Sequence, residues 1–391
     1  MGAVPGEALP AGYLAASPEQ IVDGNGVRLR PFQEADLDEL VAGCTDPVTQ
    51  RFVPTLPRPY THADARRWVA EGAAAAWAGG GAAYAIADPD SDRLLGGASV
   101  GRVVPERAQA EVGFWVVPRA RRRGVATAAT RTLATWAFAR GFGRLELLTE
   151  PENTASQRVA LAAGFQREGV RRGAVVHPDG QRYDLIAWVR LAGDPPGPSP
   201  RLLPDLPGGG LADGVVALRP VGPDDADFLH ALHGLPDVVA SSVPPVAPTP
   251  AETALRAARA ASRWLAGERA DLVIVDAGTG APAGELGLYY QEPLIGTAMV
   301  GYSMLPAWRG RGYATRALRL LCRWAFDEVG VARLTAGTKP DNARSQRVLQ
   351  RAGFRREGLL RGRLPWQAGE RLDDVLFALL PADLAPGGEP A

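Results

Sequence analysis

The chain has 391 residues, of which 46% are hydrophobic and 22% charged, so it is long enough for two or three globular domains. Lysine plus arginine number 43, as do aspartate plus glutamate, which leaves a net charge of zero. A nucleic-acid-binding protein normally has an excess of basic residues, and no apolar run approaches the ~20 residues of a membrane-spanning helix. We therefore expect neither nucleic acid nor a membrane among the partners.

Three segments have the composition of irregular chain. Residues 1–22 are rich in alanine, proline and glycine, lack the regions of a signal peptide, and are expected to form a disordered tail. Residues 193–213 carry many prolines and glycines and are interpreted as an interdomain linker, and residues 384–391 as a second tail. Cys44 and Cys322 form no disulfide or metal-binding pattern, which favours a reducing cytoplasm and no metal site.

The two remaining stretches, 23–192 and 214–383, repeat one pattern. Residues 27–31 recur at 216–220, and later motifs recur 188 or 189 residues apart, which indicates two copies of one domain. In the first copy we expect strands and helices, in chain order, at 27–31, 34–41, 63–76, 82–88, 94–104, 109–117, 127–138, 144–149, 153–164 and 182–191. In the second copy we expect them at 216–220, 224–232, 251–265, 271–276, 283–290, 297–305, 315–326, 333–337, 342–353 and 371–380. Strands that alternate with helices predict an α/β or mixed α+β domain in each half.

An Arg-x-x-Gly-x-Ala motif stands between a strand and a helix in both halves, at 121–126 and at 309–314. The first turn of such a helix directs free backbone N–H groups and a partial positive charge at one spot, which suits a pyrophosphate. The second copy has Gly310 and Gly312 where the first has Arg122 and Gly124, so we expect its backbone to approach the phosphate more closely. A solvated turn is the alternative interpretation of either motif alone.

An Asn-x-x-Ser motif opens the next helix of each half, at Asn153 and Ser156 and again at Asn342 and Ser345. Each of these helices is followed by Ala-Gly-Phe, whose glycine suits a helix C-terminus. Each asparagine also stands where a helix N-cap is expected, so capping explains it equally well.

These motifs together resemble the GNAT superfamily of acetyltransferases, and within it the ribosomal-protein N-terminal acetyltransferase (RimJ/RimL) type. The resemblance covers residues 25–192 and 214–382. It implies two tandem domains, each with a mixed, mostly antiparallel twisted sheet flanked by helices, which bind acetyl-CoA or another acyl-CoA. It also implies that the backbone amides of Val117 and Leu305 hold the pantetheine arm and that amides of the Arg-x-x-Gly-x-Ala loops hold the pyrophosphate.

The resemblance implies one set of cofactor-binding residues in each half. In the first half these are Val116, Val117, Arg121, Arg122, Arg123, Gly124, Val125, Ala126, Thr127, Asn153 and Arg158. In the second half they are Met304, Leu305, Arg309, Gly310, Arg311, Gly312, Tyr313, Ala314, Thr315, Asn342 and Arg347.

Aminolysis of a thioester needs a base for the amine proton and a stabilised oxyanion, but no covalent enzyme intermediate. Glu111 is the candidate base of the first half, whereas the aligned Met299 of the second half cannot accept a proton. Glu285 is the candidate replacement there, and a structural carboxylate is the alternative interpretation of both glutamates. Ser156 and Ser345 are candidates for a hydrogen bond near the leaving thiolate.

We therefore expect an N-acetyltransferase that transfers an acetyl or other acyl group to a primary amine by direct attack in a ternary complex. The acceptor is a peptide or protein N-terminus or a small amine-bearing molecule. The first half is expected to be catalytic, and the second half to be either a second enzyme or a CoA-binding partner. A longer acyl-CoA or an acyl carrier protein is an alternative donor, and a non-catalytic acyl-CoA sensor or scaffold is the alternative of another class. A monomer with two pseudo-equivalent domains and a homodimer both remain possible.

The acceptor is expected to contact the proline-rich segments 45–61 and 235–249, where Asp46 and Asp237 could anchor an amine. Four arginines near the last strands could favour an acidic group on the acceptor: Arg171, Arg172, Arg361 and Arg363. His177 is expected at the surface because it lies in a Pro-Asp-Gly turn. The high usage of alanine, glycine, proline and arginine resembles that of bacteria with GC-rich genomes.

Overall fold

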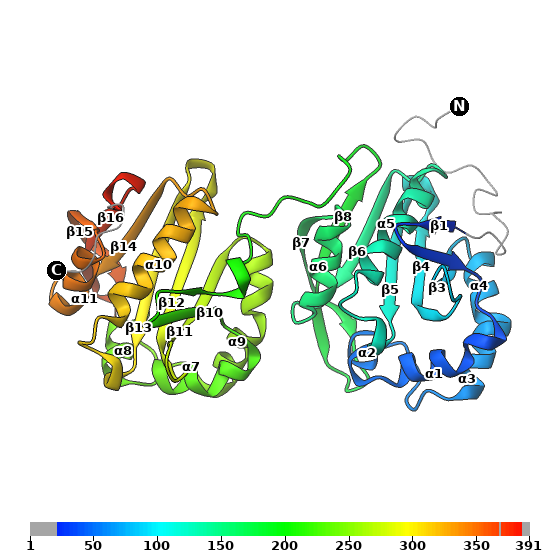
Figure 1. Cartoon of the computed structure of the whole chain (residues 1–391), viewed down its shortest axis with the longest axis horizontal. Coiled ribbons are helices and arrows are strands. Elements are labelled where there is room, and N and C mark those ends of the chain that lie inside the picture. Colours follow the sequence, from blue (N-terminus) through cyan, green and yellow to red (C-terminus); the bar gives the residue numbers. More distant parts are fainter. Residues whose placement is uncertain (1–21, 367–368, 385–391) are drawn as a thin grey trace. The chain divides into compact units, whose positions relative to one another are not determined.

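The computed structural model describes residues 22–366 and 369–384 (Figure 1). Almost all of the two expected tails lies outside these residues. The chain divides into two compact units, residues 1–200 and 201–391. Each unit contains one eight-stranded sheet with helices packed against it, as Figure 1 shows for each unit separately. The predicted fold of two tandem α/β domains is therefore confirmed.

The sheet of the first domain has the strand order β1-β2-β3-β4-β5-β6-β8-β7. The strands are β1 (Val22–Gly24), β2 (Val27–Arg30), β3 (Ala82–Ala87), β4 (Leu94–Val104), β5 (Gln109–Val116), β6 (Arg144–Thr149), β7 (Gln166–Val176) and β8 (Arg182–Leu191). The helices are α1 (Leu37–Thr45), α2 (Pro47–Phe52), α3 (His62–Arg67), α4 (Ala73–Ala78), α5 (Val125–Phe138) and α6 (Thr154–Ala162), with a π-helical turn at Trp68–Gly72 between α3 and α4. Neighbouring strands are antiparallel except β5 and β6, which are parallel.

The second domain repeats this arrangement in the order β15-β16-β14-β13-β12-β11-β10-β9. Its strands are β9 (Leu211–Ala212), β10 (Val216–Pro220), β11 (Arg269–Asp276), β12 (Pro282–Glu292), β13 (Thr297–Met304), β14 (Arg333–Thr338), β15 (Arg355–Pro365) and β16 (Arg371–Leu379). Its helices are α7 (Ala226–His233), α8 (Pro236–Ser241), α9 (Pro250–Leu265), α10 (Tyr313–Asp327) and α11 (Ala343–Arg351). The parallel pair here is β13 and β14.

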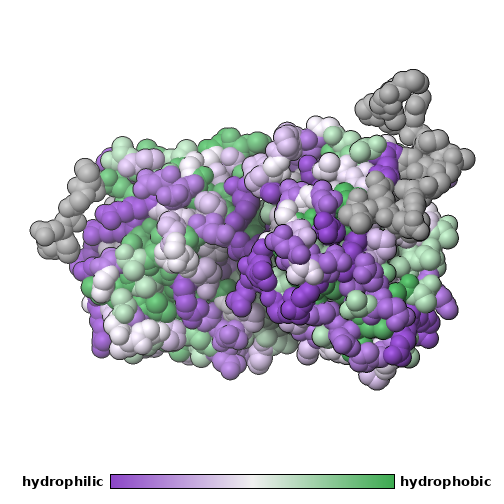
Figure 2. Space-filling view, turned by 45° about the vertical axis from the view of Figure 1, so that its right-hand side comes forward, coloured by the Kyte–Doolittle hydropathy of each residue, from purple (hydrophilic) through white to green (hydrophobic). Residues whose placement is uncertain are grey.

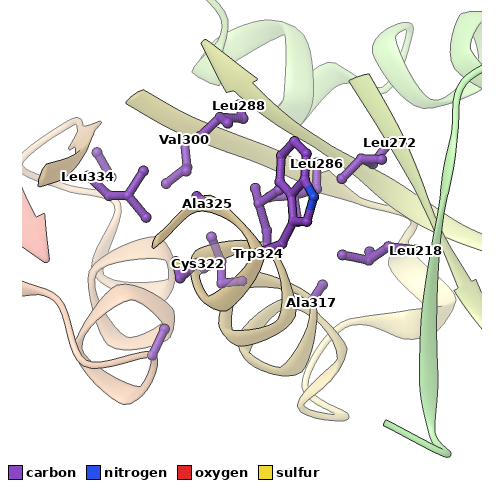
Figure 3. Packing of buried hydrophobic residues seen from close by; sticks show 14 of the residues in the cluster. Leu218, Leu272, Leu286, Leu288, Val300, Ala317, Cys322, Trp324, Ala325 and Leu334 are labelled. Carbon is purple, nitrogen blue, oxygen red and sulfur yellow. The ribbon is translucent and has the colours of Figure 1, made fainter. Parts of the chain in front are cut away.

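The core of the second domain forms where α10 packs on the sheet, as Figure 3 shows. Ala317, Cys322 and Ala325 of α10 are fully buried against Leu286 and Leu334 of the strands. Alanines let the helix approach the sheet closely, and each fully buried leucine contributes about 1.5–3 kcal/mol. The burial of Cys322 raises the pKa of its thiol, so this cysteine is a packing residue and not a nucleophile.

The segment expected to be a linker is partly built into the second domain. Leu203 and Leu206 are buried in that domain's core, and the indole N–H of Trp264 donates to the Pro204 carbonyl at 2.9 Å. Further along, β9 pairs with β10. The proline and glycine content indicated irregular backbone but not whether the segment is exposed. Leu203 and Leu206 are enough to bury a segment that has little regular structure.

Two further differences concern the predicted elements. Strands β7 and β15 were not predicted, because their mostly exposed sequences, QREGVRRGAVV and RREGLLRGRLP, lack the apolar alternation of a half-buried strand. The predicted helix 63–76 is interrupted by the π-helical turn, whereas its counterpart α9 is continuous. Among the described helices, none combines the length and the apolarity needed to cross a membrane. On the face shown in Figure 2, hydrophilic residues are mixed with small groups of hydrophobic residues.

Candidate active site

The parallel strands of each sheet separate towards one end. In the first domain β5 pairs with β6 only from Gln109 to Glu111, so the later residues of β5 have no partner strand on that side. In the second domain the pairing of β13 with β14 is equally short, from Thr297 to Met299. The gap that results exposes backbone N–H and C=O groups, which a bound chain of amide groups can satisfy.

The backbone amides of Val117 and Leu305, which we expected to hold the pantetheine arm, do not point into this gap. The Val117 N–H donates to the Leu95 carbonyl at 2.9 Å, and the Leu305 N–H donates to the Ala283 carbonyl at 2.9 Å. Both amides are therefore occupied by the neighbouring antiparallel strand and are not available to a pantetheine arm. Because antiparallel pairing alternates, the preceding residues Val116 and Met304 direct their amides to the gap instead.

The Arg-x-x-Gly-x-Ala segments form the same turn in both domains. Gly124 and Gly312 are the N-caps of α5 and α10, with φ of 78° and 82°, which favour glycine. Arg122 adopts φ 59° at the position where Gly310 has φ 74°. The first copy thus reaches the same backbone conformation at some conformational cost.

The start of each of these helices leaves amides available. The first amide of α5 that bonds back along the helix is that of Ala128, to the Gly124 carbonyl at 2.9 Å. In α10 it is that of Arg316, to the Gly312 carbonyl at 3.1 Å. The amides of the preceding residues have no carbonyl four residues earlier in the helix, so both turns can hold an anion.

The side chains of Arg121 and Arg309 bind other parts of the protein, which leaves the expected role of the loop amides unaffected. Arg121 donates to the Val116 carbonyl at 3.2 Å, to Thr49 Oγ1 at 3.0 Å and to Asp46. Arg309 likewise donates to the Met304 carbonyl at 2.9 Å and pairs with Asp237. These arginines connect each turn to the end of the preceding strand and to a short helix, which is α2 in the first domain and α8 in the second.

The same contacts correct the proposed role of the two aspartates. Asp46 is the N-cap of α2, accepts from the Thr49 amide at 2.9 Å and binds Arg121. Burial alone would raise the pKa of Asp46, but the hydrogen bonds from Arg121 and Thr49 outweigh burial and lower the pKa. Asp237 is committed to Arg309, whose hydrogen bond lowers the pKa of Asp237. Neither carboxylate is free to anchor an amine.

The Asn-x-x-Ser motifs form the N-termini of α6 and α11. Asn153 accepts from the Ser156 amide at 3.2 Å, and Asn342 accepts from the Ser345 amide at 3.1 Å. Both asparagines are therefore N-caps, as one of our two interpretations held. Capping uses only the side-chain oxygen, so the amide NH2 of each asparagine is still able to donate to a ligand.

Two adjoining pockets lie in the first domain. One, of about 450 Å³, extends from the Arg-x-x-Gly-x-Ala turn to the start of α6. It is lined by most residues predicted to bind the cofactor in this half: Val116, Arg121, Arg122, Gly124, Val125, Ala126, Thr127, Asn153 and Arg158. The other, of about 860 Å³, contains Glu111. Phe114, Asn153 and Ser156 line both, so the two pockets meet at the centre of the gap between β5 and β6.

Glu111 lies on β5 with a quarter of its side chain exposed to the second pocket. Burial raises the pKa of its carboxyl, and the nearby Glu146 raises it further, whereas Arg102 and Arg171 act in the opposite direction. Arg102 donates to Glu111 at 3.2 Å from an exposed position. A carboxylate with a raised pKa that faces a cavity is suited to accept a proton from an amine.

Glu146 is a functional candidate that we did not predict. It is the partner of Glu111 across the parallel pair β5 and β6, is almost fully buried, and binds Arg171. The sequence signal was a single acidic residue inside the apolar strand RLELLT. In the second domain the equivalent pair is Met299 and Thr335, so neither carboxylate is present there.

Glu285 of the second domain is placed very differently from Glu111. It is buried and binds His233, Arg256 and Arg269. Burial alone raises its pKa, but the hydrogen bond from His233 and the charges of Arg256 and Arg269 outweigh this effect and lower the pKa. A carboxylate that is already saturated with cationic partners is a poor base, so the geometry argues against Glu285 as a replacement for Glu111.

The serines of the two domains also differ in their partners. Ser345 bonds to the Tyr302 hydroxyl at 2.9 Å, and burial raises the pKa of Tyr302 to about 12. Ser156 faces Phe114 at the equivalent strand position, and both line the junction of the two pockets. The Ser345 hydroxyl is therefore held by the protein, whereas the Ser156 hydroxyl has no hydrogen-bond partner among the described residues and is available to a ligand.

The remaining acceptor candidates are mostly structural. Arg171 binds the buried Glu146, and Arg363 binds Asp374 at 3.0 Å. His177 is not at the surface as predicted, because its side chain is only 10% exposed and its Nε2 lies 2.7 Å from Glu150. The two residues join the end of β6 to the hairpin of β7 and β8.

A comparison with protein families matches this architecture twice. The sequence profile described as "Acetyltransferase (GNAT) domain" matches residues 27–166 and again residues 216–355, which together are more than two thirds of the chain. The chain belongs to this family. The duplicated GNAT domain and the resemblance that the motifs indicated are thereby confirmed.

The chain is also similar to individual GNAT proteins. It is 39% identical over 87 residues to "Probable N-acetyltransferase YjcK" of Bacillus subtilis, which covers 22% of this chain and 48% of the relative. It is 35% identical over 88 residues to "[Ribosomal protein uS5]-alanine N-acetyltransferase" of Escherichia coli, which covers 22% of this chain and 45% of the relative. The match thus spans about half the length of these relatives.

Among solved structures, the chain is similar to Mycobacterium smegmatis RimJ in complex with CoA-disulfide. The identity is 26%, the TM-score 0.39, and the match covers 46% of this chain and 88% of that one.

Proposed function

We propose that the chain is an N-acetyltransferase whose first domain transfers an acetyl group from acetyl-CoA to a primary amine. The observation that supports this most directly is the pair of adjoining pockets in the first domain. One is bounded by free amides of a helix start, as an acyl-CoA pyrophosphate requires, and the other presents Glu111. The pockets meet at Phe114, Asn153 and Ser156, where a thioester and an amine would come together.

Acetyl-CoA supplies the acyl group as a thioester. The amine nitrogen attacks the carbonyl carbon, so that a C–N bond forms, the C–S bond breaks and the sulfur leaves as a thiolate. The proton of the attacking amine passes to Glu111, whose raised pKa makes it a stronger proton acceptor than an ordinary glutamate. The Ser156 hydroxyl, at the junction of the pockets, donates to the departing sulfur.

The second domain is proposed to bind acyl-CoA without transferring the acyl group. It keeps the phosphate-binding turn with Gly310 and Gly312 in left-handed conformations. It lacks both Glu111 and Glu146, and Glu285 is enclosed in ion pairs. Binding and transfer are thus separated between two copies of one fold.

The test is the substitution Glu111→Gln in the full chain, with Met299→Gln at the equivalent strand position as the matched control. Glu111→Gln is expected to lower kcat by about 10²–10⁴-fold, which is the usual contribution of a general base, while acetyl-CoA affinity is unchanged. Met299→Gln is expected to leave both quantities unchanged. Initial rates of CoA release with a panel of amines and peptides, together with calorimetric titration of acetyl-CoA, measure them.

Unchanged turnover in Glu111→Gln would remove the assignment of the base. Tight acetyl-CoA binding without CoA release in the presence of any amine would favour a sensor or scaffold over an enzyme.

A further inference from the structure

Two tryptophans form walls of the pocket that contains Glu111. Trp68 lies in the π-helical turn and Trp115 on β5, and both line the pocket and are partly exposed to it. The Trp68 ring is held at 78° to the Phe32 ring with centroids 6.0 Å apart. Their partial burial among the aliphatic residues around Leu40 and Leu94 fixes both indoles in place.

Glycines make the room for these indoles. A Cβ at Gly97 would lie 2.5 Å from Trp115 Nε1, and a Cβ at Gly72 would lie 2.5 Å from Trp68 Cε3. A Cβ at Gly43 would also collide with the Trp115 ring. Neither Gly97 nor Gly72 has a positive φ, so the nearby indole ring, and not the backbone conformation, accounts for the absent side chain.

The second domain replaces these features together. By the strand registers, Trp115 corresponds to Ser303 and Gly97 to Glu285. Trp68 corresponds to Arg256, because each lies seven residues after the N-cap threonine of its helical segment. Where the first domain has an open pocket with indole walls, the second has the buried ion pair of Arg256 and Glu285. The two indoles and the glycines beside them therefore occur together in the pocket that contains Glu111, and the fold does not require them.

The charged residues that line the pocket with Glu111 are Asp64, Arg67, Glu71 and Glu111 itself. Arg67 is paired with Asp64, which also caps α3, so these two charges cancel. Glu71 is exposed on the π-helical turn, and Glu111 is paired with Arg102, which does not line the pocket, so the lining residues carry an excess of negative charge. Such a pocket attracts a cationic amine and repels an acceptor that carries an acidic group.

Resting on the proposed function, we infer that the acceptor is a primary amine that carries an aromatic ring and no acidic group. The ring lies against the faces of Trp68 and Trp115, and the amine is directed at Glu111. Indole faces select a flat ring over a saturated ring of the same size, because offset-stacked and edge-to-face contacts add to simple area burial.

The experiment compares three acceptors with the full chain and acetyl-CoA: 2-phenylethylamine, 2-cyclohexylethylamine and the dipeptide amide Ala-Ala-NH2. We expect kcat/KM to be about ten-fold higher for the phenyl than for the cyclohexyl amine, and higher than for the peptide. Trp115→Leu is expected to remove the phenyl preference. Gly97→Ala, whose Cβ meets the Trp115 indole, is expected to raise KM for the phenyl amine about ten-fold with a smaller change in kcat.

The matched control is Gly169→Ala on β7, where an added Cβ meets nothing within 4 Å and φ is not positive. It is expected to behave as the unmodified chain. The stoichiometry of acetyl-CoA binding to every variant shows whether the first domain is still folded, because two sites per chain are expected when both domains bind and one when only the second domain does. A loss of preference is thereby separated from a loss of structure.

Equal kcat/KM for the phenyl and cyclohexyl amines would overturn the stacking argument. A clear preference for the peptide would overturn the substrate class but leave the proposed function intact, provided that Glu111→Gln abolishes that turnover. Absence of turnover with all three acceptors would contradict the inference and the proposed function together.

Discussion

Neutralising Glu285 is expected to destabilise the second domain strongly. The Glu285 side chain is 6% exposed and forms ion pairs with His233, Arg256 and Arg269. Glu285→Gln removes the charge but keeps the volume, so Arg256, whose side chain is 24% exposed, retains Asp271, at 3.3 Å, as a carboxylate partner. Breaking a buried pair by removing one partner costs about 3–5 kcal/mol.

The stability of the second domain can be measured in the full chain by hydrogen exchange of peptides from β11 and β12. A loss of about 3–5 kcal/mol corresponds to roughly 150-fold to 5,000-fold faster exchange of their most protected amides. Peptides from β3 and β4 of the first domain provide an internal reference. Glu292→Gln, an exposed glutamate of the same strand β12, is the control substitution and is expected to have no effect.

The effect should also depend on pH in a defined direction. The pKa of Glu285 is lowered in the folded domain, so its contribution is present above the ordinary pKa of a glutamate and is lost as pH falls through the folded value. The difference between Glu285→Gln and the unmodified chain should therefore shrink in acid. A change of less than ten-fold in exchange at neutral pH would refute the reasoning.

The double substitution Glu285→Gln with Arg256→Met should lower the free energy of unfolding by less than the sum of the two single substitutions.

Three further outcomes follow from the structure. Glu146→Gln removes a like charge that raises the pKa of Glu111, so the acid limb of the kcat/KM–pH profile should move to lower pH; a shift to higher pH contradicts the assignment. Gly312 has φ 82°, and an alanine in this left-handed conformation costs about 1–2 kcal/mol, so Gly312→Ala should weaken acetyl-CoA binding to the second domain about five- to thirty-fold in calorimetry. Gly358→Ala is the control and should leave this binding unchanged. Leu203→Ala should destabilise the second domain by about 2–5 kcal/mol in denaturant unfolding, whereas a free linker predicts no change.

The sequence alone was sufficient for the duplicated fold. The repeat offset, the apolar strands and the turn before α5 and α10 are local features, so their interpretation did not require knowledge of which elements meet. The left-handed conformation at Gly124 and Gly312 is an example, because only the backbone of a tight helix start requires it. The asparagine caps at Asn153 and Asn342 are equally local.

What only the tertiary structure decided is the set of partners that each side chain has. Arg121 and Asp46 are 75 residues apart, and no spacing rule indicates that they bind each other and not a ligand. Glu111 and Glu285 are both strand glutamates in the sequence. One faces a pocket beside Glu146, while the other is enclosed by His233 and two arginines, because burial and neighbouring charge are set by elements distant in the chain. The positions of the Trp68 and Trp115 indoles, and the glycines that make room for them, depend on the same long-range packing.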